Sequence, residues 1–284
     1  MHDEHEHEDP RLDRGLRFDV STLMSRRRAL GMFAGVAGAA FLSACGAKVS
    51  SSTGGPTSDR TTSTTTTSNS ASSAGSSSVI PTETAGPYPG DGSNGPDVLK
   101  ESGIVRSDIR SSFGSSTTTA SGVPLTVRLK ILNNSAGNVA YSGAAVYLWH
   151  CNKDGQYSMY GNGIEDENYL RGVQEADSDG HLAFTTIFPA AYSGRWPHIH
   201  FEVYSDLATA TSSGPIKKTT QLALPEDVCK IVYATSGYEQ SVRNLASTSL
   251  ARDMVFGDDK AATQLASVAG SVAEGYVATL NVPV

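Results

Sequence analysis

The stretch LTVRLKIL, residues 125–132, carries the pattern that decides the fold. Apolar side chains stand at every second position from Leu125 to Ile131, and threonine, arginine and lysine stand between them. A period of two gives an extended chain one apolar and one polar face, whereas a helix repeats about every 3.6 residues. The stretch therefore predicts a strand that buries one face.

Further strands are expected on either side of this one, and turn residues such as Asn, Asp, Gly and Ser separate them. Short strands joined by polar turns predict a mainly β fold, an antiparallel β-sandwich. Helical periodicity is weak, so a few short helices are expected, over residues 226–234, 238–247 and 259–269. The other expected strands cover residues 144–150, 182–187, 197–204, 219–224 and 275–282.

The strand at 197–204 contains His198-Ile199-His200, and residues two apart on a strand point to the same face. Two imidazoles on one face could share a metal ion, although many such pairs are accidents of the surface. Tyr192 precedes the pair, and Tyr157 follows a Lys-Asp-Gly turn. Either tyrosine alone could be an ordinary packing residue. Together with the histidines, they form a possible set of four metal ligands.

Two phenolates would select the metal by their charge and hardness. An unperturbed tyrosine has a pKa near 10, so a strongly Lewis-acidic ion must favour its ionisation. Zinc is usually held by cysteine, histidine and carboxylate. The proposed ligands therefore favour Fe(III).

The region around these residues resembles the intradiol ring-cleavage dioxygenases, the family of catechol 1,2- and protocatechuate 3,4-dioxygenases. The resemblance covers about residues 80–225, with its motifs in one order, and it is closest to the exported, lipoprotein-like branch. The matching motifs are E-T-A-G-P-Y (83–88), W-H-C-x-x-x-G-x-Y (149–157), L-R-G-V-Q (170–174), D-S-D-G (177–180), F-x-T-I-x-P (184–189), Y-x-x-R (192–195), H-I-H-F (198–201) and T-Q-L (220–222).

The resemblance implies an Fe(III) enzyme that cleaves a catechol-type ring between its two hydroxyls. Both atoms of O2 would enter the product, a muconate-type diacid. Tyr157 resembles the equatorial tyrosinate ligand, and Tyr192 resembles the axial tyrosinate that substrate displaces and that then accepts a proton. His198 and His200 resemble the two histidine ligands.

Other positions match residues around the substrate. Arg195 resembles an active-site arginine that would stabilise negative charge on the ring, and Gln221 resembles a polar residue near that ring. Pro87 and Tyr88 resemble a segment that borders the pocket. On the residues alone, Arg195 could instead pair with a surface acid, and Gln221 could be an ordinary strand residue.

Two departures from the family pattern stand out. Pro189-Ala190-Ala191-Tyr192 replaces the usual Pro-Gly-x-Tyr, and alanine resists the positive φ that glycine allows, so the turn before Tyr192 is expected to be restricted. The stretch after residue 225 offers no motif on which to align it with the family. Nearer the centre, we expect Trp149 to be a core residue, His150 not to be a ligand, and Leu170-Arg171-Gly172 to be a structural turn.

Two other functions fit part of the pattern. A non-catalytic transthyretin-like or carbohydrate-binding module on a lipid tether would explain the strands but neither the tyrosines nor the histidine pair. A cupin-like metal enzyme would need a glutamate farther downstream of the histidines. Glu202 is too close to them and would share the face of His200.

The N-terminal part of the chain predicts export. Arg26, Arg27 and Arg28 precede an apolar run, which is typical of a signal of the twin-arginine kind, and Leu42-Ser43-Ala44-Cys45 resembles a lipobox. We therefore expect residues 1–45 to be an extension and signal, 46–79 a disordered Ser/Thr-rich tether, and 80–284 the folded domain. The protein would be anchored through lipidated Cys45 to the outer face of the bacterial cell membrane.

Charge and cysteine content set the remaining expectations. The net charge of −7 over 284 residues makes nucleic-acid binding a poor hypothesis. Export would place Cys151 and Cys229 where a disulfide is plausible, but two independent buried thiols fit the sequence equally well. The particular catechol and the oligomeric state stay open.

Overall fold

The computed structural model describes residues 78–284. The expected signal, Cys45 and nearly all of the expected tether lie outside these residues. No helix in the described part of the chain is long and apolar enough to cross a membrane.

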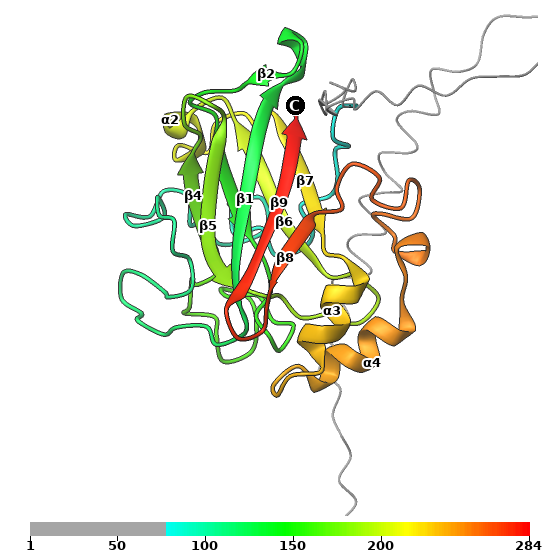
Figure 1. Ribbon diagram of the computed structural model, residues 1–284. Coiled ribbons are helices and arrows are strands. Elements are labelled where there is room, and N and C mark those ends of the chain that lie inside the picture. The colour runs from blue at the N-terminus through cyan, green and yellow to red at the C-terminus, as the bar shows by residue number, and fades with distance from the viewer. Residues whose placement is uncertain (1–77) are drawn as a thin grey trace, which may run out of the picture.

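Two β-sheets face each other, as the alternation predicted (Figure 1). In the first sheet, β2, β1, β9 and β8 follow in that order, and β5 also pairs with β1. The second sheet has the order β4-β3-β6-β7. All pairs are antiparallel except β1 with β9, which run parallel. The strands are β1 (Pro124–Asn133), β2 (Val139–Ala140), β3 (Ala145–Trp149), β4 (Arg171–Glu175), β5 (His181–Ile187), β6 (His198–Tyr204), β7 (Lys218–Ala223), β8 (Ser267–Ser271) and β9 (Gly275–Pro283).

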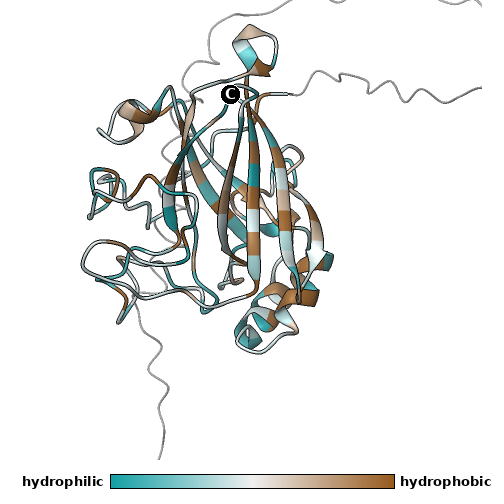
Figure 2. Cartoon of the chain, turned by 60° about the vertical axis from the view of Figure 1, so that its left-hand side comes forward, coloured by the Kyte–Doolittle hydropathy of each residue, from teal (hydrophilic) through white to brown (hydrophobic). Residues whose placement is uncertain are grey.

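The main core lies between the two sheets. Strand β1 sends alternate apolar side chains into it, and hydropathy alternates visibly along the strands of Figure 2. The opposing strands β3 and β6 contribute their own apolar residues, among them Leu148 and Phe201. Burial of this apolar area is the main force that holds the sheets together.

The four-stranded sheet is buried on its outer face as well. Every residue of β3 and β6 is buried, which is unlike a strand that exposes one face to water. A second apolar cluster covers this outer face, with Val98, Leu99 and Ile104 from the N-terminal loops packed near Trp149 and Tyr157. The side chains expected to bind a metal lie on this covered face.

The helices are short, as expected. Helices α3 (Glu226–Tyr233) and α4 (Glu239–Ser247) match two expected stretches and lie together at one end of the sandwich (Figure 1). The others are η1 (Asn134–Ala136), α2 (Leu207–Ala210) and η2 (Leu250–Arg252).

Two expectations were wrong. Residues 259–269 do not form a helix: Lys260 and Ala261 have positive φ, which ends any helix there, and the segment then continues into β8. Leu170-Arg171-Gly172 is not only a turn, because Arg171 begins β4 and pairs with Trp149 of β3. Strand β4 could not be predicted from alternating apolar residues, because its first residue is a buried arginine.

Cys151 and Cys229 are both buried free thiols, so the structure contains no bridge between them. They belong to different apolar clusters, Cys151 to the outer cluster and Cys229 to the main core. Burial raises the pKa of the Cys151 thiol to about 12, which keeps it protonated and unreactive.

Candidate metal centre

One row of side chains crosses the outer face of the four-stranded sheet. Trp149 lies opposite Arg171 on one side and opposite His200 on the other, and His200 lies opposite Gln221. Residues directly paired across neighbouring strands share a face. Strand pairing therefore brings three distant parts of the sequence beside His200, and His198 lies two residues away on the same face.

The two histidines point their Nε2 atoms at each other, 3.1 Å apart. His198 Nδ1 lies 2.5 Å from the carbonyl oxygen of Trp196, and only a protonated Nδ1 can donate to it. The lone pair of His198 is therefore on Nε2. Burial, reinforced by the charge of Arg195, holds the pKa of His198 well below its ordinary value, so the ring is neutral. A neutral imidazole with a lone pair toward a shared point is the form that binds metals.

Both expected tyrosines lie beside the histidine pair. The Tyr192 hydroxyl lies 3.0 Å from His198 Nε2, and the Tyr157 and Tyr192 rings are 6.0 Å apart in an edge-to-face arrangement. The Tyr157 hydroxyl is buried without a hydrogen bond of normal geometry. Burial and the neighbouring Tyr192 phenol raise the pKa of Tyr157 well above 10. Without a cation, therefore, this phenol is held in its neutral form.

These four side chains fit a trivalent metal ion. Two imidazole nitrogens and the Tyr192 phenol oxygen converge in a buried place. The Tyr157 ring lies 6.0 Å from the rings of both Tyr192 and His200, and its hydroxyl lacks a good partner. No group of three or more His, Cys, Asp or Glu residues that could hold a metal occurs among residues 78–284, so the phenols are needed to complete a set. A bound cation would offset the burial that now disfavours their ionisation.

Arg195 and Gln221 lie beside the candidate ligands. Arg195 Nη2 donates to Gln221 Oε1 at 2.7 Å, and its Nη1 lies 3.5 Å from His198 Nε2. The Gln221 amide in turn donates to the carbonyl of Thr84 at 2.9 Å. The expected arginine and glutamine are thus both at the centre, and the alternative of a surface ion pair for Arg195 was wrong because this side chain is only 2% exposed.

Two polar residues at the centre were not expected from the sequence. Asp253 accepts from Arg195 Nε at 3.0 Å, and it comes from the stretch after residue 225, which offered no motif. Arg171 is buried and donates to five acceptors, which lie on two loop segments and on strand β3. The acceptors are the carbonyls of Tyr88, Pro89 and Ser158 and the hydroxyls of Ser158 and Tyr147.

Tyr88 lies where a pocket-bordering residue was expected. Its ring centroid is 5.1 Å from that of Tyr157 and 5.2 Å from that of Tyr160. Arg171 holds the Tyr88 carbonyl and the Ser158 carbonyl at the same time, at 3.0 and 2.9 Å. It therefore joins the segment of Tyr88 to the segment of Tyr157.

The residues expected not to bind a metal have other partners. His150 is buried, with Nε2 2.6 Å from the Thr186 hydroxyl and Nδ1 2.8 Å from the Cys151 carbonyl. Glu202 accepts from the Tyr204 hydroxyl at 2.7 Å. Its other carboxylate oxygen accepts from the Thr219 hydroxyl of β7 at 3.3 Å, so the partners of Glu202 are side chains other than the two histidines.

The alanines before Tyr192 are accommodated without strain. Neither Ala190 nor Ala191 has a positive φ, so the expected restriction of this turn does not arise. Ala191 donates its N–H to the Ser241 hydroxyl at 3.1 Å, and its carbonyl accepts from Asn244 at 2.8 Å. Helix α4 therefore holds the turn that presents Tyr192.

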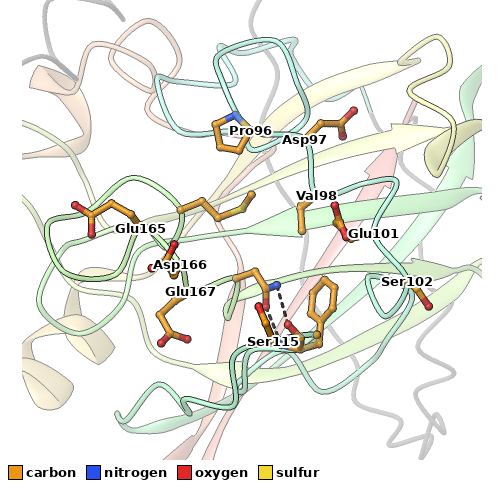
Figure 3. Close-up of a pocket in the computed structure, with 13 residues that line it drawn as sticks. Pro96, Asp97, Val98, Glu101, Ser102, Ser115, Glu165, Asp166 and Glu167 are labelled. Atoms are coloured by element: carbon orange, nitrogen blue, oxygen red, sulfur yellow. Dashed lines mark hydrogen bonds between the residues drawn. The ribbon is translucent and has the colours of Figure 1, made fainter.

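A separate cavity of about 370 Å³ lies beside Met159. Figure 3 shows the carboxylates around it, among them Asp97, Glu101 and Glu165. None of the candidate ligands lines this cavity. Its chemistry is that of an acidic surface hollow, distinct from the metal centre.

The chain is similar to known dioxygenases. A protein-family model described as dioxygenase matches residues 94–249, more than half of the chain and all four candidate ligands. A solved intradiol ring-cleavage dioxygenase from Tetranychus urticae is 23% identical, with a TM-score of 0.57 over 73% of this chain and 94% of that one. At this identity the likeness shows the fold alone.

Two further solved structures are similar. The dioxygenase domain of a dioxygenase carbohydrate-binding protein fusion from Streptomyces sp. SirexAA-E is 23% identical, with a TM-score of 0.46 over 73% of this chain and 98% of that one. Catechol 1,2-dioxygenase from Pseudomonas arvilla C-1 is 17% identical, with a TM-score of 0.39 over 62% of this chain and 55% of that one.

Proposed function

We propose that this chain, which belongs to the intradiol ring-cleavage dioxygenases, holds Fe(III) through Tyr157, Tyr192, His198 and His200 and cleaves catechol-type rings with O2. Family membership makes it an oxidoreductase. The product would be a muconate-type diacid that contains both oxygen atoms. The observation that carries the proposal is the convergence of two imidazole nitrogens 3.1 Å apart with the Tyr192 hydroxyl 3.0 Å from one of them.

When bound, Fe(III) would supply Lewis acidity, which favours the ionised forms of phenols and of a catechol and draws electron density from the ring. The protein's own groups would do the remaining work. Tyr192 is the less buried of the two tyrosines, so it is the phenol placed to accept a catechol proton as a general base. Tyr157 is 4% exposed and would stay in place as a permanent ligand.

Arg195 would stabilise negative charge that develops on the ring. Its guanidinium is buried and lies 3.5 Å from His198 Nε2, so it is fixed in place before substrate arrives. Fixed donors in a water-poor site stabilise developing charge more strongly than water does. Gln221 accepts from the same guanidinium and would keep its plane turned toward the ring.

The covered outer face would also keep water away from the reacting ring. His198 and His200 are 2% and 3% exposed, and Trp149 lies flat against His200. A dry site strengthens every charge interaction within it and limits side reactions of activated oxygen species.

The direct test is the visible spectrum of the purified, iron-loaded chain, recorded before and after catechol is added without oxygen. We expect a broad tyrosinate-to-Fe(III) band that shifts with catechol and is lost or displaced in Tyr157→Phe and Tyr192→Phe. Ring cleavage on admission of O2 would complete the assignment. A colourless protein that refuses iron would overturn the proposal and favour a tethered binding module.

We also propose that the chain is exported and anchored through lipidated Cys45 to the outer face of the bacterial cell membrane, with residues 46–79 as a tether. The support is the sequence: an arginine cluster, an apolar run and a lipobox-like Leu42–Cys45. Fractionation of cells that express the full chain tests this. The protein should be found with membranes, and Cys45→Ser should release it. A soluble wild-type protein would contradict the anchor.

A further inference from the structure

The segment Asp253–Phe256 lies against the candidate metal centre, although the family match ends at residue 249. Phe256 is fully buried, and its ring centroid is 6.4 Å from that of His198. The same ring lies under the guanidinium of Arg195, whose Cζ is 5.9 Å from the ring centroid. This C-terminal segment therefore forms one wall of the centre.

Asp253 fixes the segment to the rest of the centre through both carboxylate oxygens. Oδ2 accepts from Arg195 Nε at 3.0 Å and from the Trp196 backbone N–H at 2.6 Å. Oδ1 accepts from the N–H groups of Val255 and Phe256 at 2.8 and 3.1 Å. A carboxylate with four donors and a side chain that is 0% exposed is tightly constrained in position.

Arg195 is held along two edges of its planar guanidinium. Asp253 binds Nε on one edge, and Gln221 binds Nη2 at 2.7 Å on another. A planar guanidinium whose Nε and Nη2 are both hydrogen-bonded has a fixed orientation, so the position of its Nη1 is fixed as well. The third point, Nη1, is the one that lies 3.5 Å from His198 Nε2.

We propose that Asp253 is a positioning residue that acts through Arg195, aiming Nη1 at the candidate ligands and neutralising the arginine charge beside them. The catalytic consequence rests on the proposed function. Without Asp253, the buried guanidinium would lose the carboxylate that binds its Nε, next to the place where a metal cation would bind. Repulsion and desolvation would both favour its turning away.

The test is a double-mutant cycle of Asp253→Asn and Arg195→Met, with Asp258→Asn as a control because Asp258 is an exposed acid two residues after this segment. Asp253→Asn should lower kcat/KM for catechol about tenfold or more, chiefly through kcat. Iron content and the visible band should stay near those of wild type, since all four ligands remain. Asp258→Asn should stay within about twofold of wild type.

The cycle separates positioning from general damage. In the Arg195→Met background, Asp253→Asn should cause little further loss of kcat/KM, because the residue through which it acts is already gone. The metal-free double variant should also melt at a higher temperature than metal-free Arg195→Met, in which the buried Asp253 carboxylate keeps its backbone donors but loses the guanidinium that balances its charge. An equal loss of kcat/KM in both backgrounds would overturn the proposal.

A second variant covers the case in which Asp253→Asn does not fold. Asp253→Glu keeps the charge but moves the carboxylate, so kcat should fall while iron stays bound, and a wild-type kcat would contradict positioning. If wild-type protein cleaves no catechol, the proposed function fails instead. The melting temperatures of the metal-free cycle still measure whether Asp253 and Arg195 are coupled.

Discussion

Trp149 and His200 lie directly opposite each other on β3 and β6, and their rings stack 5.0 Å apart with planes 8° from parallel. The His200 Nδ1 has no hydrogen-bond partner among the described residues, whereas His198 Nδ1 is bonded to the Trp196 carbonyl. Metal-binding histidines usually have their second nitrogen bonded, which fixes the ring. The indole of Trp149 therefore orients His200 in place of a hydrogen bond.

Replacing Trp149 by leucine should loosen His200. We expect Trp149→Leu to lower the free energy of unfolding of the metal-free protein by about 2–4 kcal/mol, because a large buried ring is lost. Iron affinity should fall about tenfold or more, as when the support of a metal ligand is removed. Denaturant titration and competition with a chelator measure the two effects. Trp149→Phe keeps a stacking ring, so its free energy of unfolding and its iron affinity should fall less than those of Trp149→Leu. Equal decreases in the two variants would argue against stacking.

Arg171 should be indispensable for the segment that carries Tyr157. Arg171→Met would remove the arginine donors to the buried carbonyls of Tyr88 and Ser158, at about 1–3 kcal/mol each. We expect a large drop in melting temperature and faster amide exchange near Ser158. Arg171→Lys should recover only part of the stability, because one ammonium cannot replace a planar fork.

The control for this prediction is Arg110→Lys. Arg110 is exposed and pairs with Asp108 at 2.7 Å on the surface, where such pairs contribute little. Its melting temperature should match wild type. An Arg171→Lys protein as stable as wild type would show that charge alone, without the hydrogen-bond geometry, holds the two segments together.

The stability of the domain should depend on pH through Glu83. Burial and the charges of Asp258 and Asp259 raise the pKa of Glu83 from 4.5 to about 8. Because the folded state binds this proton more tightly than the unfolded state, the stability it contributes is present below pH 4.5 and is lost as pH rises through about 8. The melting temperature of the wild-type protein should therefore fall between pH 5 and pH 9.

Glu83→Gln should show a smaller fall in melting temperature from pH 5 to pH 9, because glutamine does not titrate in this range. The measurement is the difference in melting temperature between the two pH values for each protein. Glu101→Gln, which changes an exposed acid, should behave as wild type. The same loss in Glu83→Gln as in wild type would mean that another group carries the pH dependence.

Most of the strands could be predicted because each contributes a regular apolar face. Strand β1 is the clearest case, with apolar and polar positions in strict alternation. Strand β4 could not be found in this way, because its first residue is a buried arginine whose partners come from distant loops. Strand β8 was missed for the opposite reason: it is an edge strand that is mostly exposed, so its composition carries no apolar signal.

The candidate site divides in the same way. Tyr157, Tyr192, His198 and His200 could be named from local motifs, and the fold brings them together through strand pairing and one turn. Asp253 could not be named, because its role depends on a contact with Arg195 across 58 positions of sequence. This contact between Asp253 and Arg195 depends on how the C-terminal segment packs against the sheet, and a local sequence motif does not predict such packing.

The two alanines before Tyr192 should stabilise the turn rather than strain it. Since φ is not positive at Ala191, a glycine there would only gain freedom in the unfolded chain and lose a buried methyl group. Ala191→Gly should therefore lower the free energy of unfolding by about 1 kcal/mol, measured from the denaturant midpoint. The tyrosinate band should be unchanged, because Ser241 and Asn244 still hold the backbone of the turn. Gly180→Ala provides the contrast, since φ is +79° and a Cβ would lie 2.5 Å from the Ile131 carbonyl oxygen, so it should destabilise more. A more stable Ala191→Gly protein would show that the alanine is strained after all.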